Sequence, residues 1–341
     1  MPDATASPVT RLPMSRRMLA VILLAPLVAA VALWAAGWTG ARLAPRDLPL
    51  GVAGPPAATA RLQTSLEERE GAFDIHRYAD EAAAKEAIKD HEVYGAVVAT
   101  PQGPKLLTAS AAGPMVAQML TTVAAQQAPQ GTVVPTEDVV PAPSADPRGA
   151  ALSGSMLPLA IAGIAAGALV TLLQLRGTRA VGALVGAAAL VGAAGTAIAG
   201  SWLDALTGNW WAEAGTLGLV ALAIGSAVAG LAAVIGQPGI GLMAMLIMLI
   251  GNPFSAVTSA PQLLPEPAGL IGQLLPPGAG ASLVRSVAFF DGNGGGGPAL
   301  TLGVWVVLGL LGVVLGGLRA DRAETAAPAS DRDLAPAGSV A

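Results

Sequence analysis

The sequence contains no cysteine and only two histidines, His76 and His91. Without cysteine the chain has no disulfide framework, no thiolate nucleophile and no cysteine-based metal site. The two histidines fall in different predicted elements, and no set of histidines and carboxylates has the spacing of metal ligands. We therefore expect no catalytic residue, no metal and no cofactor, and the sequence predicts a protein that is not an enzyme.

Charge is also scarce, because Asp, Glu, Lys and Arg make up 12% of the residues, against about 25% in a typical soluble domain. The charge is missing from long apolar runs, and a helix needs about 20 such residues to cross a bilayer. The sequence therefore predicts a polytopic α-helical membrane protein with six transmembrane helices. The six runs are Met18–Gly40, Met156–Leu175, Ala180–Gly200, Gly215–Ile235, Gly239–Val257 and Ala299–Leu318.

Between the first two runs lies a polar stretch that has the pattern of a soluble domain. Residues 41–150 are expected to form an extracytoplasmic α/β domain, of which the Pro-rich part Gln130–Pro147 is an extended tether. The remaining parts are a cytoplasmic N-terminus (1–17), a five-helix membrane domain (151–318) and a disordered cytoplasmic tail (319–341). The order β-α-β-α-β-β-α predicts a mixed sheet. The expected strands are Leu48–Ala53, Phe73–Tyr78, Val93–Ala99 and Lys105–Ser110, and the expected helices are Ala57–Glu70, Glu81–Glu92 and Pro114–Gln127.

Arginine placement predicts the orientation, since cytoplasmic connections are rich in Lys and Arg. Arg16 and Arg17 precede the first run, and Arg176 and Arg179 bound the short connection after the second run. We therefore expect a multi-pass plasma-membrane protein with both termini in the cytoplasm. The first apolar run is longer than the core of a signal peptide, so it is expected to stay as an uncleaved anchor. The opposite connections carry acids, namely Asp204, Glu213, Glu266 and Asp291.

None of the six predicted spans contains an ionisable residue. Because such residues mark proton relays, their absence argues against a proton-driven transporter. Small residues instead recur four positions apart in the later spans and predict close helix packing or a dimer interface. These pairs include Gly163 and Gly167, Gly182 and Gly186, and Gly312 and Gly316.

The stretch before the last span, Asn252–Pro298, is apolar but broken by prolines. Such a backbone is tolerated at membrane depth only where protein shields it. Residues 258–298 are therefore expected to fold back into the outer membrane boundary as a re-entrant element, with Arg285 paired to Glu266 or to lipid headgroups. The residues expected to form this outer gate are Pro253, Pro265, Pro276, Pro277 and Arg285.

The order of these parts resembles the ABC-2 type permease superfamily, including its YhgE/Pip (phage infection protein) relatives. The resemblance covers nearly the whole chain. It rests on the outer α/β domain with its strand segment Val93–Val98, on five further helices, and on Leu264–Pro265, Leu274–Pro276 and Arg285 between helices five and six. It implies export across the plasma membrane by a homodimer in the lipid bilayer, powered by a separate ATP-binding subunit because the chain has no Walker motif. No nucleic-acid partner is expected. The abundance of Ala, Gly, Val and Arg beside three Lys points to a GC-rich genome of actinobacterial type.

Two hypotheses follow. In the first, the chain is a permease-like subunit that moves a lipid-like or amphipathic substrate, with Arg16, Arg17, Arg176 and Arg179 at the ATPase interface. Permeases of this superfamily that couple to an ATPase usually carry a longer charged segment between helices two and three than Arg176–Arg179. This departure keeps a second hypothesis open, a non-transporting envelope protein whose outer domain binds a partner as a receptor, scaffold or secretion accessory.

Overall fold

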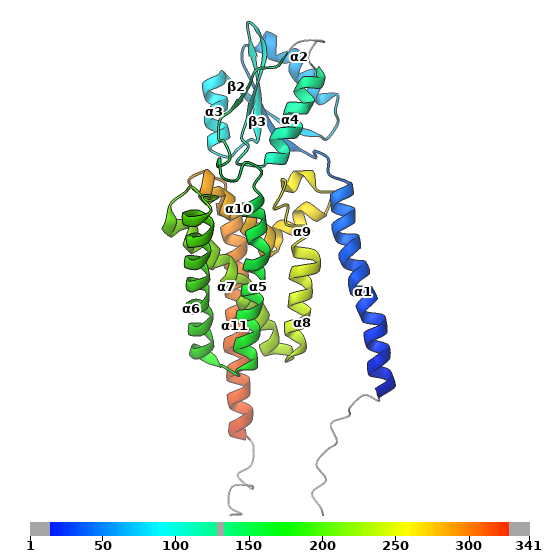
Figure 1. The fold of residues 1–341 in the computed structure, drawn as a ribbon, viewed down its shortest axis with the longest axis vertical. Helices are drawn as coiled ribbons and strands as arrows, with labels where there is room; N and C mark the ends of the chain where they lie inside the picture. The colour runs from blue at the N-terminus through cyan, green and yellow to red at the C-terminus, as the bar shows by residue number, and fades with distance from the viewer. Residues whose placement is uncertain (1–13, 128–132, 327–341) are drawn as a thin grey trace, which may run out of the picture.

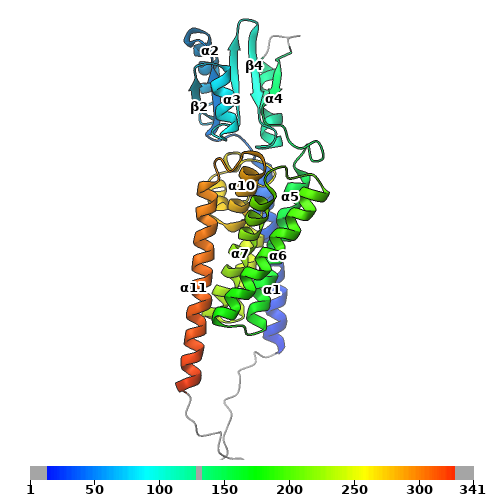
Figure 2. The same ribbon diagram turned by 90° about the vertical axis from the view of Figure 1, so that its left-hand side faces the viewer.

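The computed structural model describes residues 14–127 and 133–326 of the 341-residue chain. In this part of the chain an α/β domain stands on one end of a bundle of long helices (Figure 1). Helix α1 (Met14–Ala41) leads up to the α/β domain, and helix α5 (Ala150–Leu172) leads from it back into the bundle (Figures 1 and 2). The lower end of α1 and the end of the last helix lie at the same end of the molecule, opposite the α/β domain.

The α/β domain is built on one mixed sheet with the strand order β2-β1-β3-β4-β5. Strand β1 pairs in parallel with β2 and β3, β3 pairs antiparallel with β4, and β5 pairs in parallel with β4. Because the chain steps from β1 to β2 and then back past β1 to β3, right-handed crossovers place α2 and α3 on opposite faces. The elements are β1 (Leu48–Ala53), α2 (Pro56–Glu67), β2 (Phe73–Tyr78), α3 (Glu81–Lys89), β3 (Gly95–Thr100), β4 (Gly103–Thr108), α4 (Pro114–Gln127) and β5 (Thr136–Asp138).

Strand β5 corrects the interpretation of the Pro-rich stretch as an extended tether. Thr136–Asp138 pairs with β4 in the register Leu106 to Thr136, and the Val139 amide donates to the Thr108 carbonyl over 2.8 Å. These residues have no alternating apolar pattern, so the sequence contains no strand signal there. The strand forms because the edge of β4 offers unpaired backbone groups to any segment that passes along it.

A closed ring of ion pairs attaches β5 to α3 and β4. Glu81 and Glu137 each contact Lys85 and Lys105 at N–O distances of 2.6–2.9 Å. Hydrogen bonds from Lys105 and then Lys85 lower the pKa of both carboxyls, and the same bonds raise the pKa of the two lysines. Since each carboxylate accepts from two ammonium groups, the ring orders three elements at once.

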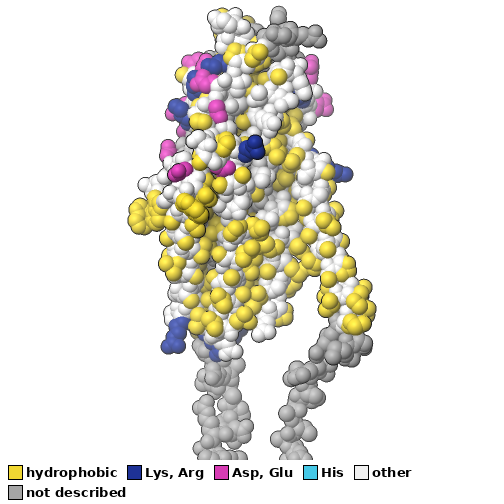
Figure 3. Space-filling model, viewed as in Figure 1, with side chains coloured by type: hydrophobic (Ala, Val, Ile, Leu, Met, Phe, Trp, Pro, Cys, Tyr) yellow, Lys and Arg dark blue, Asp and Glu magenta, His cyan; other side chains and the backbone are white. Residues whose placement is uncertain are grey.

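Five helices of the described residues are long and apolar enough to cross a membrane: Val21–Ala41, Ala150–Leu172, Gly177–Trp202, Trp210–Ile235 and Gly296–Arg319. They belong to α1, to α5, to α6 (Gly177–Thr196) with its π-helical end η1 (Ala197–Trp202), to α7 (Trp210–Ile235) and to α11 (Gly296–Ala326). Apolar side chains cover the surface of this bundle, whereas charged side chains gather on the α/β domain (Figure 3). The chain is a polytopic helical membrane protein.

The predicted fifth span, Gly239–Val257, is shorter in the structure. Helix α8 (Pro238–Met245) continues as the π-helix η2 (Leu246–Gly251) and ends there. Gly251 and Pro253 are both poor helix formers, which accounts for the early end. At about 1.5 Å per residue this helix does not reach across the ~30 Å of a hydrocarbon core by itself.

Helix α7 is the centre of the bundle, and it corrects the prediction that every span is free of charge. It begins at Trp210, before the predicted Gly215, and so includes Glu213, which is 3% exposed. The side chain of Asn209 caps this earlier start by accepting from the amides of Trp211 and Ala212. The Glu213 carboxylate in turn accepts from the Gly208 amide over 2.7 Å.

Glycines let α7 approach its neighbours closely. A Cβ on Gly167 of α5 would overlap the Gly225 carbonyl oxygen, and one on Gly312 of α11 would lie 2.9 Å from the Gly230 Cα. The predicted pair Gly182 and Gly186 of α6 differs, because a Cβ on either would meet no atom within 4 Å. Spacing alone therefore does not identify which glycines lie in an interface.

Candidate functional site

The segment between η2 and α11, Asn252–Gly295, forms a layer between the α/β domain and the helix bundle (Figures 1 and 2). We call this segment the platform. It contains the 3-10 helix η3 (Pro261–Leu263) and the helices α9 (Ala268–Leu274) and α10 (Pro276–Phe289). The sequence predicts this division into short helical pieces, since prolines recur along the segment.

Prolines and glycines set the path of the platform. Pro276 and Pro277 occupy the first turn of α10, where the absent amide proton costs no helical bond. Gly272 lies so close to Phe254 that a Cβ would overlap the Phe254 carbonyl oxygen, and Gly251 packs against the ring of Pro277. Of the other two prolines of the predicted gate, Pro253 follows η2 and Pro265 lies between η3 and α9.

Arg285 lies inside the platform, and its environment differs from the prediction. The side chain is 4% exposed, and Nη2 donates to the Val257 carbonyl over 2.9 Å. Glu266 is exposed and forms no ion pair with Arg285, because α10 directs the arginine towards residues of the α/β domain such as Ser110 and Pro114. Within the described residues the Arg285 Nε has no hydrogen-bond partner.

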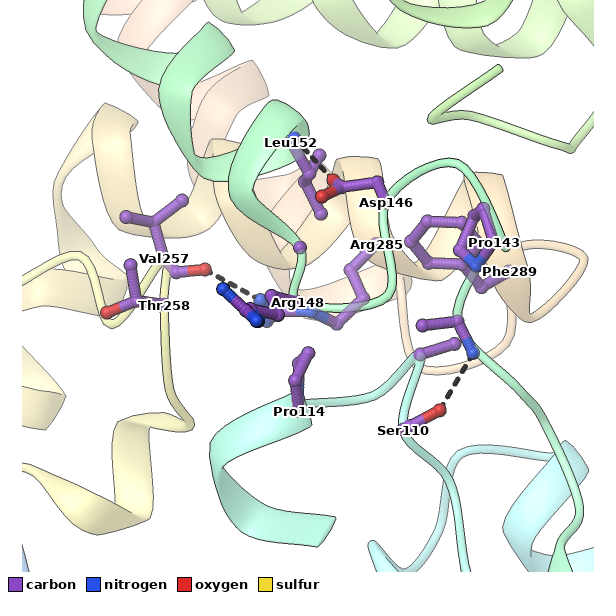
Figure 4. A pocket seen from close by; sticks show the side chains of 13 residues that line it. Ser110, Pro114, Pro143, Asp146, Arg148, Leu152, Val257, Thr258, Arg285 and Phe289 are labelled. Carbon is purple, nitrogen blue, oxygen red and sulfur yellow. Dashed lines mark hydrogen bonds between the residues drawn. The ribbon is translucent and has the colours of Figure 1, made fainter. Parts of the chain in front are cut away.

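Beside Arg285 is a cavity of about 20 Å³, enough for about one water molecule. Its walls come from the α/β domain, from the start of α5 and from the platform (Figure 4). Polar groups from Ser110, Asp146, Arg148 and Arg285 line it. The cavity therefore marks the point where the three parts of the molecule meet.

Asp146 holds the start of α5 at this junction. Its carboxylate accepts from the amides of Ala150, Ala151 and Leu152 at 2.7–3.2 Å, and the residue is 5% exposed. A carboxylate at a helix N-terminus satisfies free amides and interacts favourably with the helix dipole. Sequence reasoning missed this residue inside the predicted tether, although an aspartate just before an apolar helical run is a known start signal.

Aromatic and polar contacts join the α/β domain to the platform. The ring of His91 stacks on Phe290 with a centroid distance of 4.1 Å, and Tyr94 Oη donates to Gln262 Oε1 over 3.2 Å. Asn293 Nδ2 donates to Asp90 Oδ1 over 3.2 Å. Burial and then the nearby Arg285 charge lower the pKa of His91 to about 4, and burial raises the pKa of Tyr94. His91 is therefore neutral at pH 7.

The connection from α1 to β1 forms a second attachment of the α/β domain to the platform. The Ala44 amide donates to the Leu263 carbonyl over 3.1 Å, and Arg46 Nη1 donates to the same carbonyl over 3.0 Å. Near the top of α1, Trp38 stacks on Trp34 and also contacts Phe254 of the platform. Below this point most side chains of α1 are exposed, because only 6% of the apolar stretch within Val21–Ala41 is buried.

The predicted ATPase-docking arginines lie at the end of the molecule opposite the α/β domain. Arg176 precedes α6 and Arg179 is in its first turn, and both are exposed. Arg16 and Arg17 lie in the first turns of α1, and their side chains are outside the described part of the chain. The structure does not bring the two pairs together, because α1 and α6 stand on opposite sides of the bundle (Figure 1).

Next to Arg176 is a crevice of about 230 Å³ between α5, α7 and α11. Gln174 and Leu175 line it from the connection between α5 and α6, and Gly316 and Gly317 line it from α11. The sequence did not predict this crevice, since it depends on how α11 packs across the bundle.

Comparison with known families gives a match to part of the chain. Residues 16–136, which comprise most of α1 and nearly all of the α/β domain, match the family described as ABC-2 family transporter protein. The match covers less than half of the chain, so it shows a similarity to ABC-2 transporters in this part, and it does not bear on actinobacterial origin. No curated protein and no solved structure matches the chain.

Proposed function

Because residues 16–136 match the ABC-2 transporter family, we propose that the chain is the membrane-spanning subunit of an export system. This system moves a lipid-like or amphipathic substrate and uses a separate ATPase. The family match favours transport over catalysis. The observation that carries the proposal is the attachment of the α/β domain to the platform, through His91 on Phe290 and Tyr94 on Gln262. Because the platform connects η2 directly to α11, a movement of these helices during transport would be transmitted to the α/β domain.

The proposed topology has six crossings, with α8 and η2 as a short crossing completed by the platform. The lower end of α1 and the end of α11 both lie at the end opposite the α/β domain, which supports an even number of crossings. Arg176 and Arg179 lie at that same end, and the positive-inside rule assigns it to the cytoplasm. The α/β domain is then extracytoplasmic, and the platform with Pro253, Pro265, Pro276, Pro277 and Arg285 is the outer gate.

The proposed oligomer is a homodimer. Helix α1 presents large exposed apolar side chains on several sides, such as Leu23, Leu27 and Leu33. These side chains fit either lipid or a second copy of the chain. Nothing in the sequence favours a nucleic-acid partner, because the net charge is −4 and no basic patch is present among the predicted elements.

We place the ATPase-docking surface at Arg176 and Arg179, with Arg16 and Arg17 contributing from α1. The supporting observations are the exposure of Arg176 and Arg179 and the crevice beside Arg176. The connection between α5 and α6 is short, Leu173–Arg176. This shortness is the observation that would favour a non-transporting receptor, scaffold or secretion accessory if no ATPase binds.

The test is purification of the full chain from its native membrane in mild detergent, followed by mass spectrometry of the proteins and lipids that co-purify. We expect an ATP-binding protein to co-purify and to be lost in the double variant Arg176→Ala and Arg179→Ala. The matched control is Arg77→Ala with Lys89→Ala, which removes two exposed cationic side chains from the α/β domain. Absence of any ATP-binding protein from the wild-type sample would overturn the transport proposal.

A further inference from the structure

The α/β domain contains a partly open cavity of about 590 Å³ between α2 and α4, on the sheet face opposite α3. Protein interiors are close-packed, and few voids exceed the size of a water molecule. This cavity has about four times the volume of a 150 Å³ apolar cavity that binds benzene. It falls within the range of about 300–1,000 Å³ for small-molecule sites. A space of this size is not a packing defect.

Most of the side chains that line the cavity are apolar. Leu50 and Leu106 form its floor on the sheet, and Leu66 and Leu120 form walls from α2 and α4, each with 5% exposure or less. The sheet and α4 contribute no polar side chain. An occupant that needs several hydrogen bonds, such as a sugar or a nucleotide, would lose those bonds with water without replacing them.

Polar side chains occur at one edge only. Ser65, Glu68 and Arg69 come from the end of α2 and the turn after it. Glu68 and Arg69 are exposed and carry opposite charges. This edge suits a polar headgroup, whereas the interior suits a chain without polar atoms.

The apolar interior around the cavity continues towards the membrane. Leu50 and Leu120 belong to one buried cluster that also contains Ala260 and Leu263 of the platform. The cavity is therefore connected by apolar side chains to the layer that covers the helix bundle.

We infer that the cavity between α2 and α4 binds an acyl chain of a membrane phospholipid, with the headgroup at the edge formed by Ser65, Glu68 and Arg69. This inference rests on the proposed function, since it gives the lipid-like substrate a place in the outer domain. Binding itself requires neither an ATPase nor nucleotide. The two proposals can therefore fail separately.

The test uses the full chain reconstituted in vesicles of phosphatidylcholine and phosphatidylglycerol that contain a trace of phosphatidylcholine with a photoactivatable diazirine in one acyl chain. After illumination, labelled peptides are identified by mass spectrometry, without ATP or a partner protein. We expect adducts on peptides of α2, α4 and β3 in addition to the lipid-exposed peptides of α1 and α11. Labelling of α1 and α11 without any adduct in the α/β domain overturns the inference.

Two adjacent alanines of α4 provide matched variants. Ala124 lines the cavity, whereas Ala125 is exposed and does not line it. Ala124→Trp fills the space with an indole ring, so the adducts in the α/β domain should be lost, whereas Ala125→Trp should leave them unchanged. Leu62→Trp fills the cavity from α2 and should act like Ala124→Trp. Circular dichroism shows whether each variant folds, and undiminished labelling in folded Ala124→Trp and Leu62→Trp also overturns the inference.

Discussion

The ring of His91 stacks on the ring of Phe290, with centroids 4.1 Å apart and planes inclined by 9°. His91 follows α3 of the α/β domain, and Phe290 follows α10 of the platform. Phe290 is 2% exposed and belongs to the buried cluster of the α/β domain, although it is far away in the sequence. The contact therefore joins the α/β domain to the platform through an aromatic pair, in addition to the hydrogen bonds between them.

The first prediction is that acid weakens this contact. The pKa of His91 is lowered to about 4 from an ordinary value of 6.5. Between these values the unfolded chain binds more protons than the folded one, so stability falls as the pH drops below 6.5. At pH 5 the loss amounts to about 2 kcal/mol. Hydrogen exchange of peptides around His91 should become faster at pH 5 than at pH 7.5.

The matched variant for this prediction is His91→Asn. His91 has φ of 59°, a left-handed conformation that asparagine tolerates better than most residues. The variant loses the stacking but cannot be protonated, so its exchange should change much less between the two pH values. An equal acid response in the variant would assign the pH dependence to another group.

The second prediction concerns helix packing around α7. Gly167→Ala adds a methyl group where the Gly225 carbonyl already lies, whereas Gly182→Ala adds one where no atom lies within 4 Å. Overpacking costs about 1–3 kcal/mol, and alanine in an open helical position gains up to about 1 kcal/mol over glycine. Thermal unfolding in detergent should therefore shift down for Gly167→Ala and stay the same or rise for Gly182→Ala. Equal shifts would mean that α5 and α7 do not pack as described.

The third prediction concerns the start of α5. Asp146→Ala removes the acceptor for three backbone amides, and loss of a cap costs about 1–2 kcal/mol. Asp74→Ala, which removes an exposed carboxylate from β2, is the control. Limited proteolysis should cut faster between β5 and α5 in Asp146→Ala than in the control. Unchanged cleavage would show that other contacts hold this junction.

Elements with strong local patterns follow from the sequence. The expected strands Leu48–Ala53 and Phe73–Tyr78 and the expected helix Pro114–Gln127 have the same bounds in the structure. Their patterns of apolar residues and turn residues act locally and need no partner to be recognised. Strand β5 could not be recognised in this way, because its hydrogen bonds come from the edge of β4 and its charge partners come from α3.

The candidate site was less accessible to sequence reasoning. Residues of the platform could be named from their prolines, but the partner of Arg285 could not, because α10 turns this side chain towards the α/β domain and away from Glu266. The burial of Glu213 in α7 also depends on a helix start set by Asn209 and on the neighbouring Gly208. These features arise from contacts between segments that are distant or irregular.

The sequence by itself determined that this chain is a membrane protein and that a polar α/β domain follows its first helix. Both features could be recognised because hydropathy and short-range periodicity are properties of neighbouring residues. Only the tertiary structure decided that the platform carries the α/β domain, that His91 stacks on Phe290, and that a cavity remains open between α2 and α4. The physical reason is that packing is decided by shape and by burial between distant segments, and a one-dimensional pattern does not contain either.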